Sequence, residues 1–293
     1  MNEEQALAQL TALRWPKGAQ CPFCRLHQVT KLGGKRQGFY QCNRCRKQFT
    51  VRTGTIFERS HVPLSKWLQA VHLLCASKKG MSALQVSRML GLTYKTAWFL
   101  CHRIREAMRS PGGLLGGIVE VDETYVGGKT GNAHKGRSTV KKTPVVAVIQ
   151  RDGEARTRVV RHVSSRNLMK TIQDNVDVES TIMTDDLRAY RNLDGIFYKH
   201  EAVVHTKGEY VRGNAHVNTC ESFFALLKRG IHGSFHHVSK HHLHRYSTEF
   251  EFRWNTRKGT DAERELVALK LVEGKRLLYR TLTDEKRKKG QTN

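Results

Sequence analysis

The stretch GIVEVDETYV, residues 117–126, decides the fold of the larger part of this 293-residue chain. Alternate side chains of a strand point to opposite faces, so Ile118, Glu120 and Asp122 share one face while Glu123 points to the other. The stretch follows a proline and four glycines at positions 111–117, which end the preceding helical pattern. It therefore predicts the first strand of a new domain.

Further strand and helix patterns follow this first strand. Strand-like runs are expected at 142–152, 156–163, 180–186 and, more weakly, 200–205, and helices at 166–176, 187–193 and from about 218 to 228. The polar, glycine-rich segment 127–142 is expected to be a mobile basic loop. The order of elements is that of the ribonuclease-H-like plan, which predicts an α/β domain with a mixed sheet.

Three acids fall where such a domain could hold metal ions. Asp122 ends the first strand, Asp185 ends the fourth, and Glu221 lies on the late helix. Carboxylates are the hard oxygen ligands that Mg²⁺ or Mn²⁺ prefers, and a pair of such ions catalyses in-line phosphoryl transfer. A single acid at a strand end is more often a turn or capping residue, so the prediction depends on the three together.

The charge of the chain indicates a polyanionic partner. Its 51 Lys and Arg against 26 Asp and Glu give a formal charge of +25, and residues 1–110 alone carry 19 − 4 = +15. A basic excess of this size is typical of nucleic-acid-binding proteins. No apolar run reaches the roughly 18 residues of a membrane span. We therefore expect a cytoplasmic, nucleoid-associated protein that binds double-stranded DNA, with no membrane partner.

Two Cys-x-x-Cys pairs predict a structural zinc site. Cys21 and Cys24 are separated by 17 residues from Cys42 and Cys45. Two such turns supply the four thiolates of a tetrahedral Zn²⁺ site, and the segment between them suits a ribbon of hairpins. A disulfide pairing is the alternative, but it would require an oxidising compartment.

A helix-turn-helix pattern follows the ribbon. A helix is expected over 82–90, Gly91 makes the turn, and Thr93 can cap a further helix that begins at Tyr94. In this arrangement the start of the second helix enters the major groove, so Tyr94, Lys95 and Thr96 are the candidate DNA-binding residues. A simple three-helix packing unit is the alternative.

These motifs together resemble a known family. VDETYVGGK, TDDLRAYRNL and HVNTCESFFALLKRGIHGSFHHVSKHHLHRYSTEFEFRWN, preceded by the CPFC and CNRC pairs, are similar to bacterial insertion-sequence transposases of the DDE superfamily. The closest branch has an N-terminal zinc ribbon, the insertion-sequence family fifteen ninety-five. The resemblance covers roughly residues 15 to 280. It implies recognition of terminal inverted repeats, DNA cleavage and strand transfer, with the protein acting as a homo-oligomer on DNA.

The resemblance also implies a role for a lysine and leaves two ligands open. In the family a lysine follows the last acid by two helical turns, and here Lys228 lies seven residues after Glu221. Asp185 is favoured over Asp186 because it matches the family's Thr-Asp position. Asn218 is the rival of Glu221 as third ligand, since relatives can place an amide there.

Four segments are expected: a zinc ribbon at 1–58, a helix-turn-helix domain at 59–110, the ribonuclease-H-like domain at 111–260, and a C-terminal helix with a basic tail at 261–293. Two other functions remain possible at this point. One is a catalytically inactive DNA-binding regulator derived from a transposase, and the other is a nuclease that does not transfer strands.

Overall fold

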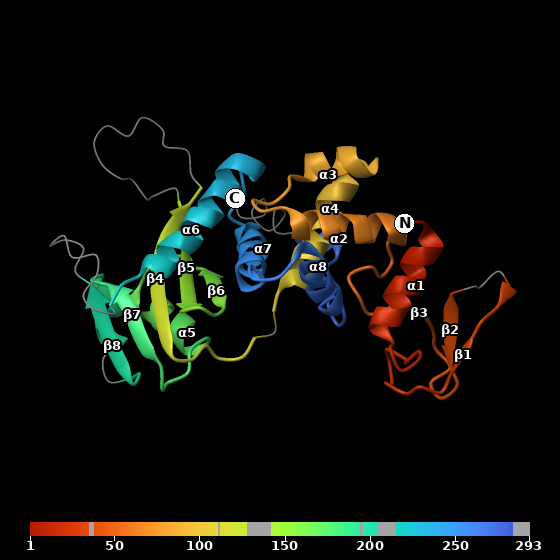
Figure 1. The fold of residues 1–293 in the computed structure, drawn as a ribbon, viewed down its shortest axis with the longest axis horizontal. Coiled ribbons are helices and arrows are strands. Elements are labelled where there is room, and N and C mark those ends of the chain that lie inside the picture. Colours follow the sequence, from red (N-terminus) through yellow and green to blue (C-terminus); the bar gives the residue numbers. More distant parts are fainter. Residues whose placement is uncertain (35–37, 111, 128–141, 194–195, 204–214, 284–293) are drawn as a thin grey trace, which may run out of the picture. The chain divides into compact units, whose positions relative to one another are not determined.

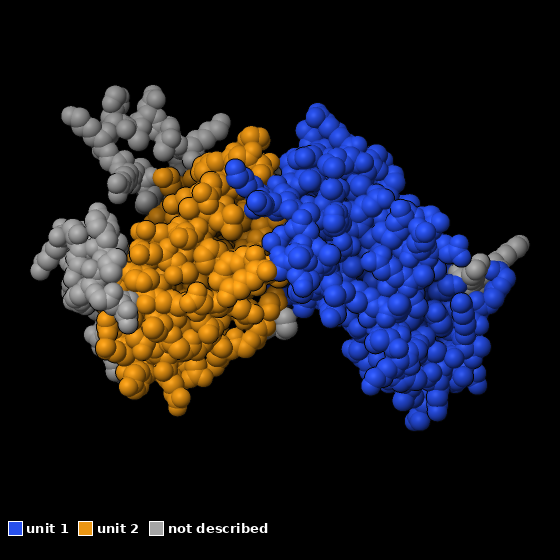
Figure 2. Space-filling view, in the orientation of Figure 1, with its two compact units in different colours: residues 1–109, 259–293 blue, residues 110–258 orange. Residues whose placement is uncertain are grey.

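The computed structural model describes residues 1–34, 38–110, 112–127, 142–193, 196–203 and 215–283. The chain divides into two compact units, residues 1–109 with 259–293 and residues 110–258 (Figure 2). We call them unit 1 and unit 2. The finer division into four segments stays a prediction, although residues 259–283 belong to unit 1. The loop expected at 127–142 lies almost entirely outside the described residues.

Unit 1 begins with a helix and a small three-stranded antiparallel sheet of order β1-β2-β3. Helices then follow, and the end of the chain returns to them (Figure 1). The elements are α1 (Glu3–Arg14), β1 (Val29–Lys31), β2 (Phe39–Cys42), β3 (Gln48–Thr50), α2 (Leu64–Ala76), α3 (Ala83–Leu90), α4 (Tyr94–Met108), α8 (Asp261–Lys270) and α9 (Tyr279–Thr283).

Helix α2 is the centre of unit 1. It contacts α1, α3, α4 and α8, and the side chains at its helical apolar positions, including Trp67 and Leu74, are buried. Pro63, which precedes α2, provides no side-chain cap, and the carboxylate of Glu3 takes that role by accepting hydrogen bonds from the N–H groups of Leu64 and Ser65 at 2.8 and 2.9 Å. A residue 61 positions earlier in the sequence therefore fixes the start of the central helix.

The expected helix-turn-helix elements form in unit 1. Thr93 caps α4 by accepting a hydrogen bond from Thr96 N–H, and Gly91 ends α3 with a left-handed backbone (φ 58°). Helices α3 and α4 pack against each other. The local capping signals in the sequence therefore correctly predicted both helix boundaries.

Unit 2 is built on a five-stranded mixed sheet of order β6-β5-β4-β7-β8. β4 pairs antiparallel with β5 and parallel with β7, which places it at the centre of the sheet. This is the mixed α/β fold expected for the ribonuclease-H-like plan. The elements are β4 (Ile118–Val126), β5 (Thr143–Gln150), β6 (Ala155–Val159), α5 (Ser165–Gln173), β7 (Thr181–Asp185), the 3₁₀ helix η2 (Arg188–Leu193), β8 (Lys199–Val203), α6 (Asn218–Gly230), the π-helical η4 (Ile231–Phe235) and α7 (Leu243–Asn255).

Both faces of this sheet are covered. Val119 and Val121 of β4 pack with α5 and η2 in one apolar cluster. Val145 and Ala147 of β5 pack with α6 and α7 in the other. β5 is buried on both faces, and its sequence is accordingly an almost continuous apolar run and not an alternation of apolar and polar residues. The acid-bearing face of β4 is the face toward α6.

None of the helices in the described part of the chain combines the length and apolar character that crossing a membrane requires.

Candidate active site and zinc site

Asp122 and Asp185 lie on neighbouring parallel strands. The paired residues of β4 and β7 end with Glu120 opposite Met183, and Asp122 and Asp185 each lie two residues beyond that pair. Continuing the register places the two acids beside each other at the same end of the sheet. Burial raises the pKa of Asp122 to about 7, and repulsion from Glu123, Asp185 and Glu221 adds to the increase. Asp122 was expected to end its strand, but it lies in the middle of β4, which continues to Val126. The three predicted acids thus come together beside the end of β7.

Glu221 reaches this place because the start of α6 is bound to β4. Val217 precedes α6 and offers no side-chain cap. The carboxylate of Glu120 accepts hydrogen bonds from Thr219 N–H at 2.7 Å, Thr219 Oγ1 at 2.8 Å and Cys220 N–H at 3.3 Å. An acid near the positive end of a helix is stabilised by its unpaired N–H groups. Glu120 therefore holds the turn that carries Glu221.

Two basic side chains surround the same carboxylate. Glu120 is fully buried, and Arg151 Nε donates to it at 2.7 Å while another guanidinium nitrogen of Arg151 donates to the carbonyl of His216 at 3.1 Å. His216 Nδ1 lies 3.2 Å from Glu120 without hydrogen-bond geometry. Because a buried charge that loses its partners is strongly destabilising, these contacts hold the Glu120 carboxylate in one position. The sequence placed Glu120 on the Asp122 face but gave no role for it.

The acids are less tightly grouped than the zinc cysteines. Among the described residues, only the four cysteines have all of their ligand atoms within 4.8 Å of one another. Glu221, Asn218 and Lys228 are all exposed on α6, so the structure does not choose between Glu221 and Asn218. Lys228 lies in the last turn of that helix.

Asp185 and Glu123 have additional contacts. Asp185 Oδ1 accepts a hydrogen bond from Leu187 N–H at 3.1 Å, so the residue also forms the turn after β7. Glu123 points to the other face of β4, as expected, and accepts a hydrogen bond at 2.9 Å from the hydroxyl of Tyr190, which is buried. Burial and repulsion from Asp185 raise the pKa of Glu123 to about 7. The sequence predicted only that Glu123 points to the other face of the strand, so its electrostatic interaction with Asp185 was not predicted.

The four cysteines of the ribbon are arranged to bind Zn²⁺. The Sγ atoms of Cys21 and Cys45 lie 3.7 Å apart and those of Cys24 and Cys42 lie 3.5 Å apart. Tetrahedral zinc with Zn–S bonds of about 2.3 Å separates sulfurs by about 3.8 Å, so the group fits the ion. The N–H of Cys45 lies 3.5 Å from Cys42 Sγ and, as the leading cause, lowers the pKa of Cys42 to about 6, whereas burial and the neighbouring sulfurs raise the pKa values of Cys24 and Cys45.

The two cysteine turns have the same backbone geometry. Arg25 N–H donates to the carbonyl of Cys21 at 2.9 Å, and Arg46 N–H donates to that of Cys42 at 3.0 Å. Both arginines have a left-handed backbone, with φ of 61° and 59°. The matching turns present the two cysteine pairs to one point.

The three DNA-binding candidates differ in their surroundings. Tyr94 is 56% exposed at the start of α4, and the hydroxyl of Thr96 lies 2.8 Å from that of Thr93. The ammonium group of Lys95 lies 5.0 Å from the ring centroid of Tyr279 on α9. The structure therefore brings Lys95 to a part of the chain that the sequence treated as a separate C-terminal segment.

Comparisons with known proteins identify the domains that contain these residues. Residues 114–255 match the family model of the ISXO2-like transposase domain, and residues 1–48 match that of the transposase zinc-ribbon domain. A Halobacterium salinarum protein described as an uncharacterized protein in transposable element ISH50 is 33% identical over 270 residues, which cover 86% of this chain and 91% of the relative. An uncharacterized transposase-like protein of Haemophilus influenzae is 29% identical over 99 residues, covering 34% of this chain and 79% of the relative.

Two solved structures show a weak overall similarity. The intasome of simian T-cell lymphotropic virus with PP2A regulatory subunit B56 gamma gives a TM-score of 0.32 at 13% identity, over 61% of this chain and 64% of that one. The Mos1 strand transfer complex gives 0.21 at 12% identity, over 64% and 75%. The family assignment depends on the sequence matches and not on these. The chain belongs to the ISXO2-like family of DNA transposases and carries that family's N-terminal zinc ribbon.

Proposed function

We propose that this transposase cuts the terminal inverted repeats of its element and joins them to target DNA by divalent-metal-dependent phosphoryl transfer at Asp122, Asp185 and Glu221. The observation that carries the proposal is that these acids come together beside the end of β7, where burial and the charges of the other acids raise the pKa of Asp122. Like charges held together in this way favour a cation between them.

The donor set suits Mg²⁺ or Mn²⁺. It consists of carboxylates, with the amide of Asn218 as an alternative, and these are oxygen ligands of the kind that hard cations take. Bound cations would lower the pKa of the attacking water or 3′-hydroxyl and stabilise charge on the leaving oxygen. Asp122 and Asp185 are fixed by the sheet, so their spacing is set before any ligand binds.

The residues around the acids have supporting roles in this proposal. Lys228 lies seven residues after Glu221, and both side chains are on the exposed face of α6. The ammonium group of Lys228 can therefore approach a phosphate on the same side of the helix as Glu221. Glu120 fixes the first turn of α6 against β4, and with it the direction in which Glu221 points. The hydroxyl of Tyr190 fixes Glu123, the acid beside Asp122 on the opposite face.

Recognition of the element ends belongs, in this proposal, to the zinc ribbon and to α4. Tyr94, Lys95 and Thr96 lie in the first turn of α4, the part of a recognition helix that approaches base edges. We expect the protein to act as a homo-oligomer on DNA, since two element ends must be handled together, and to be bound to the nucleoid in the cytoplasm.

A cleavage and joining assay tests the proposal. The full chain is incubated with labelled element ends, an unlabelled target plasmid and Mg²⁺, and the products are separated. Covalently joined products support strand transfer. Cleaved ends without joined products would support the nuclease alternative, and bound but intact ends would support the inactive regulator.

A further inference from the structure

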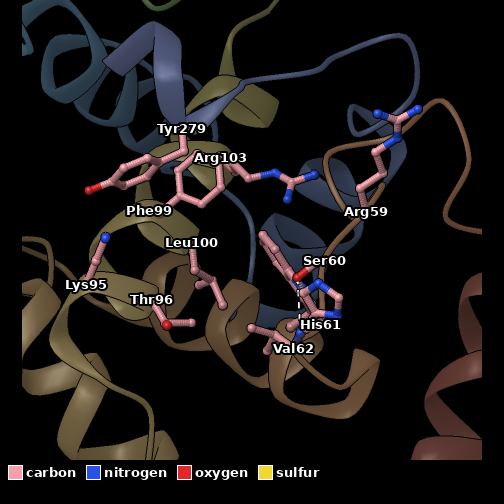
Figure 3. A pocket seen from close by; sticks show the side chains of 11 residues that line it. Arg59, Ser60, His61, Val62, Lys95, Thr96, Phe99, Leu100, Arg103 and Tyr279 are labelled. Carbon is pink, nitrogen blue, oxygen red and sulfur yellow. Dashed lines mark hydrogen bonds between the residues drawn. The ribbon is translucent and has the colours of Figure 1, made fainter. Parts of the chain in front are cut away.

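A pocket beside the recognition helix is not explained by the chemistry above. Its volume is about 260 Å³, and it lies wholly within unit 1. It is formed by the loop before α2, by one side of α4 and by α9 (Figure 3). The residues that line it are Arg59, Ser60, His61, Val62, Trp67, Lys95, Thr96, Phe99, Leu100, Arg103 and Tyr279. Lys95, Phe99 and Arg103 are spaced four apart and so form one stripe along α4.

The polar lining of this pocket is cationic. Arg59, His61, Lys95 and Arg103 line it, and no acid is among the described residues that do so. The Arg59 side chain is 80% exposed, whereas Arg103 is 4% exposed. Figure 3 shows Lys95 and Tyr279 on one side, Arg59 and His61 on the other, and the guanidinium of Arg103 between them. Arg59 also pairs with the carboxylate of Glu58, at 3.8 Å. Exposed cations and a buried one in the same lining suit an anionic ligand.

The protein satisfies the hydrogen-bond donors of Arg103 only in part. Its guanidinium donates one hydrogen bond, at 2.7 Å, to the carbonyl of Glu58, while its Nε atom is buried and has no partner among the described residues. It lies over the rings of Trp67 and Phe99, at 5.3 and 5.4 Å from their centroids. Burial lowers the pKa of Arg103 to about 10 against the attraction of Glu58. The charge of Arg103 lies in the lining of the pocket, so it can attract an anion that enters there.

The apolar part of the lining is aromatic. The rings of Phe99 and Tyr279 meet edge to face with centroids 5.4 Å apart, and Tyr279 is 37% exposed. Aromatic faces next to cationic groups are how proteins hold the bases and phosphates of single strands. The volume is below the roughly 300–1,000 Å³ of pockets for drug-sized ligands, so it suits one nucleotide rather than a longer segment.

We infer that this pocket takes one unpaired nucleotide of a DNA strand, with its phosphate on Arg59 and Arg103 and its base against Phe99 and Tyr279. The inference builds on the proposed handling of DNA strands, because a base can enter the pocket only where it is out of the duplex stack. It gives α4 two functions: the first turn, from Tyr94 to Thr96, approaches the groove, while Phe99 and Arg103 further along the helix hold a displaced nucleotide.

The first test is binding of a fluorescent single-stranded oligonucleotide to the full chain at fixed salt. Tyr279→Leu is expected to weaken binding on the order of tenfold, as loss of one stacked base does, while Tyr279→Phe keeps it. Tyr198→Leu is the matched control, because Tyr198 is 79% exposed and lies outside the pocket. Arg59→Ala should weaken binding more than Lys79→Ala, which removes the same charge from an exposed site elsewhere in unit 1.

The second test locates the base. An oligonucleotide carrying 5-iododeoxyuridine is irradiated with the protein, and the adduct is expected on Phe99 or Tyr279, with weaker binding by an oligonucleotide that is abasic at that position. Equal affinity of Tyr279→Leu and Tyr198→Leu, or of abasic and normal strands, would overturn the inference. The readout is independent of cleavage: an inactive protein that forms the adduct disproves only the proposed catalysis, and an active one with unchanged pocket variants disproves only the pocket.

Discussion

Glu120 on β4 and Thr219 on α6 are joined by two hydrogen bonds, from Thr219 N–H at 2.7 Å and from its hydroxyl at 2.8 Å, both to the buried carboxylate. The two residues are 99 positions apart in the sequence. The contact replaces the side-chain cap that α6 lacks and fixes the turn that precedes Glu221. One strand therefore carries both Asp122 and the anchor of the helix that supplies the third acid.

Removing this anchor should lower both stability and activity. Glu120→Ala leaves Arg151 and the N–H groups of Thr219 and Cys220 without their acceptor, so we expect the free energy of unfolding to fall by about 3 kcal/mol. Glu120→Gln keeps the shape but loses the charge and should have a smaller effect. Urea denaturation measures the change. Glu154→Gln, which removes a half-exposed carboxylate paired with Arg156, should change stability by less than about 1 kcal/mol.

The third ligand can be identified by metal rescue. Glu221→Cys should abolish cleavage with Mg²⁺ and recover part of it with Mn²⁺, because a thiolate is a poor ligand for the harder ion. Asn218→Ala should lower the cleavage rate by no more than about tenfold, since a neutral amide binds a divalent cation less strongly than a carboxylate does. Cleavage rates in the two metals provide the measurement. The reverse result, with Asn218→Ala inactive and Glu221→Cys active in Mg²⁺, would make Asn218 the ligand.

The raised pKa values of Asp122 and Glu123 predict a pH dependence of stability without divalent cations. Both carboxyls have pKa values of about 7, against ordinary values of 3.8 and 4.5. The folded protein then keeps protons that the unfolded chain has released, so their contribution is fully present below about pH 4 and is lost as the pH rises through 7. Urea unfolding with a chelator should show a lower free energy at pH 8 than at pH 5.

Two substitutions separate this effect from general charge repulsion. Asp122→Asn should raise the stability at pH 8 and reduce the difference between pH 5 and pH 8. Asp174→Asn should leave that difference unchanged, because Arg158 lowers the pKa of Asp174 and the residue is ionised throughout this range. A wild-type protein that is equally stable at both pH values would contradict the burial argument for Asp122.

Loss of one cysteine should release the zinc. Cys42→Ser removes a ligand from a group that lacks a large apolar core, and structural Zn²⁺ contributes on the order of 10 kcal/mol to such domains. We expect about one zinc per wild-type chain, almost none in the variant, and weaker binding to element ends. Cys75→Ala, which changes a buried cysteine of α2 outside the ribbon, should retain the metal. Retention of full zinc content by Cys42→Ser would place the site elsewhere.

The local signals in the sequence predicted much of the fold. Thr93 predicted the start of α4 and Gly91 predicted the end of α3, because capping depends on neighbours within four residues. Asp122 and Asp185 were placed in one site because the order of strands and helices predicted a ribonuclease-H-like domain, and in the structure β4 and β7 are parallel neighbours. The two cysteine pairs predicted a group that the structure forms.

What the sequence could not predict depends on tertiary contacts. Glu3 and Glu120 cap helices through Leu64 and Thr219, which lie 61 and 99 residues later, and no local pattern connects them. Tyr279 packs against Lys95 and Phe99 across a long span of sequence, so the pocket on α4 was not foreseen. The interaction of Glu123 with Asp185 was missed because an acid on the other face of a strand was expected to be separate.

The most direct test of the account compares Asp185→Asn with Asp186→Asn. Both remove one negative charge from adjacent positions, but only Asp185 is assigned to the site. Cleavage of labelled element ends with Mg²⁺ is measured alongside binding of the same DNA. We expect Asp185→Asn to lose more than about a thousandfold in rate with unchanged binding, as for an essential catalytic group, and Asp186→Asn to stay within about tenfold of wild type. A fully active Asp185→Asn protein would contradict the central claim.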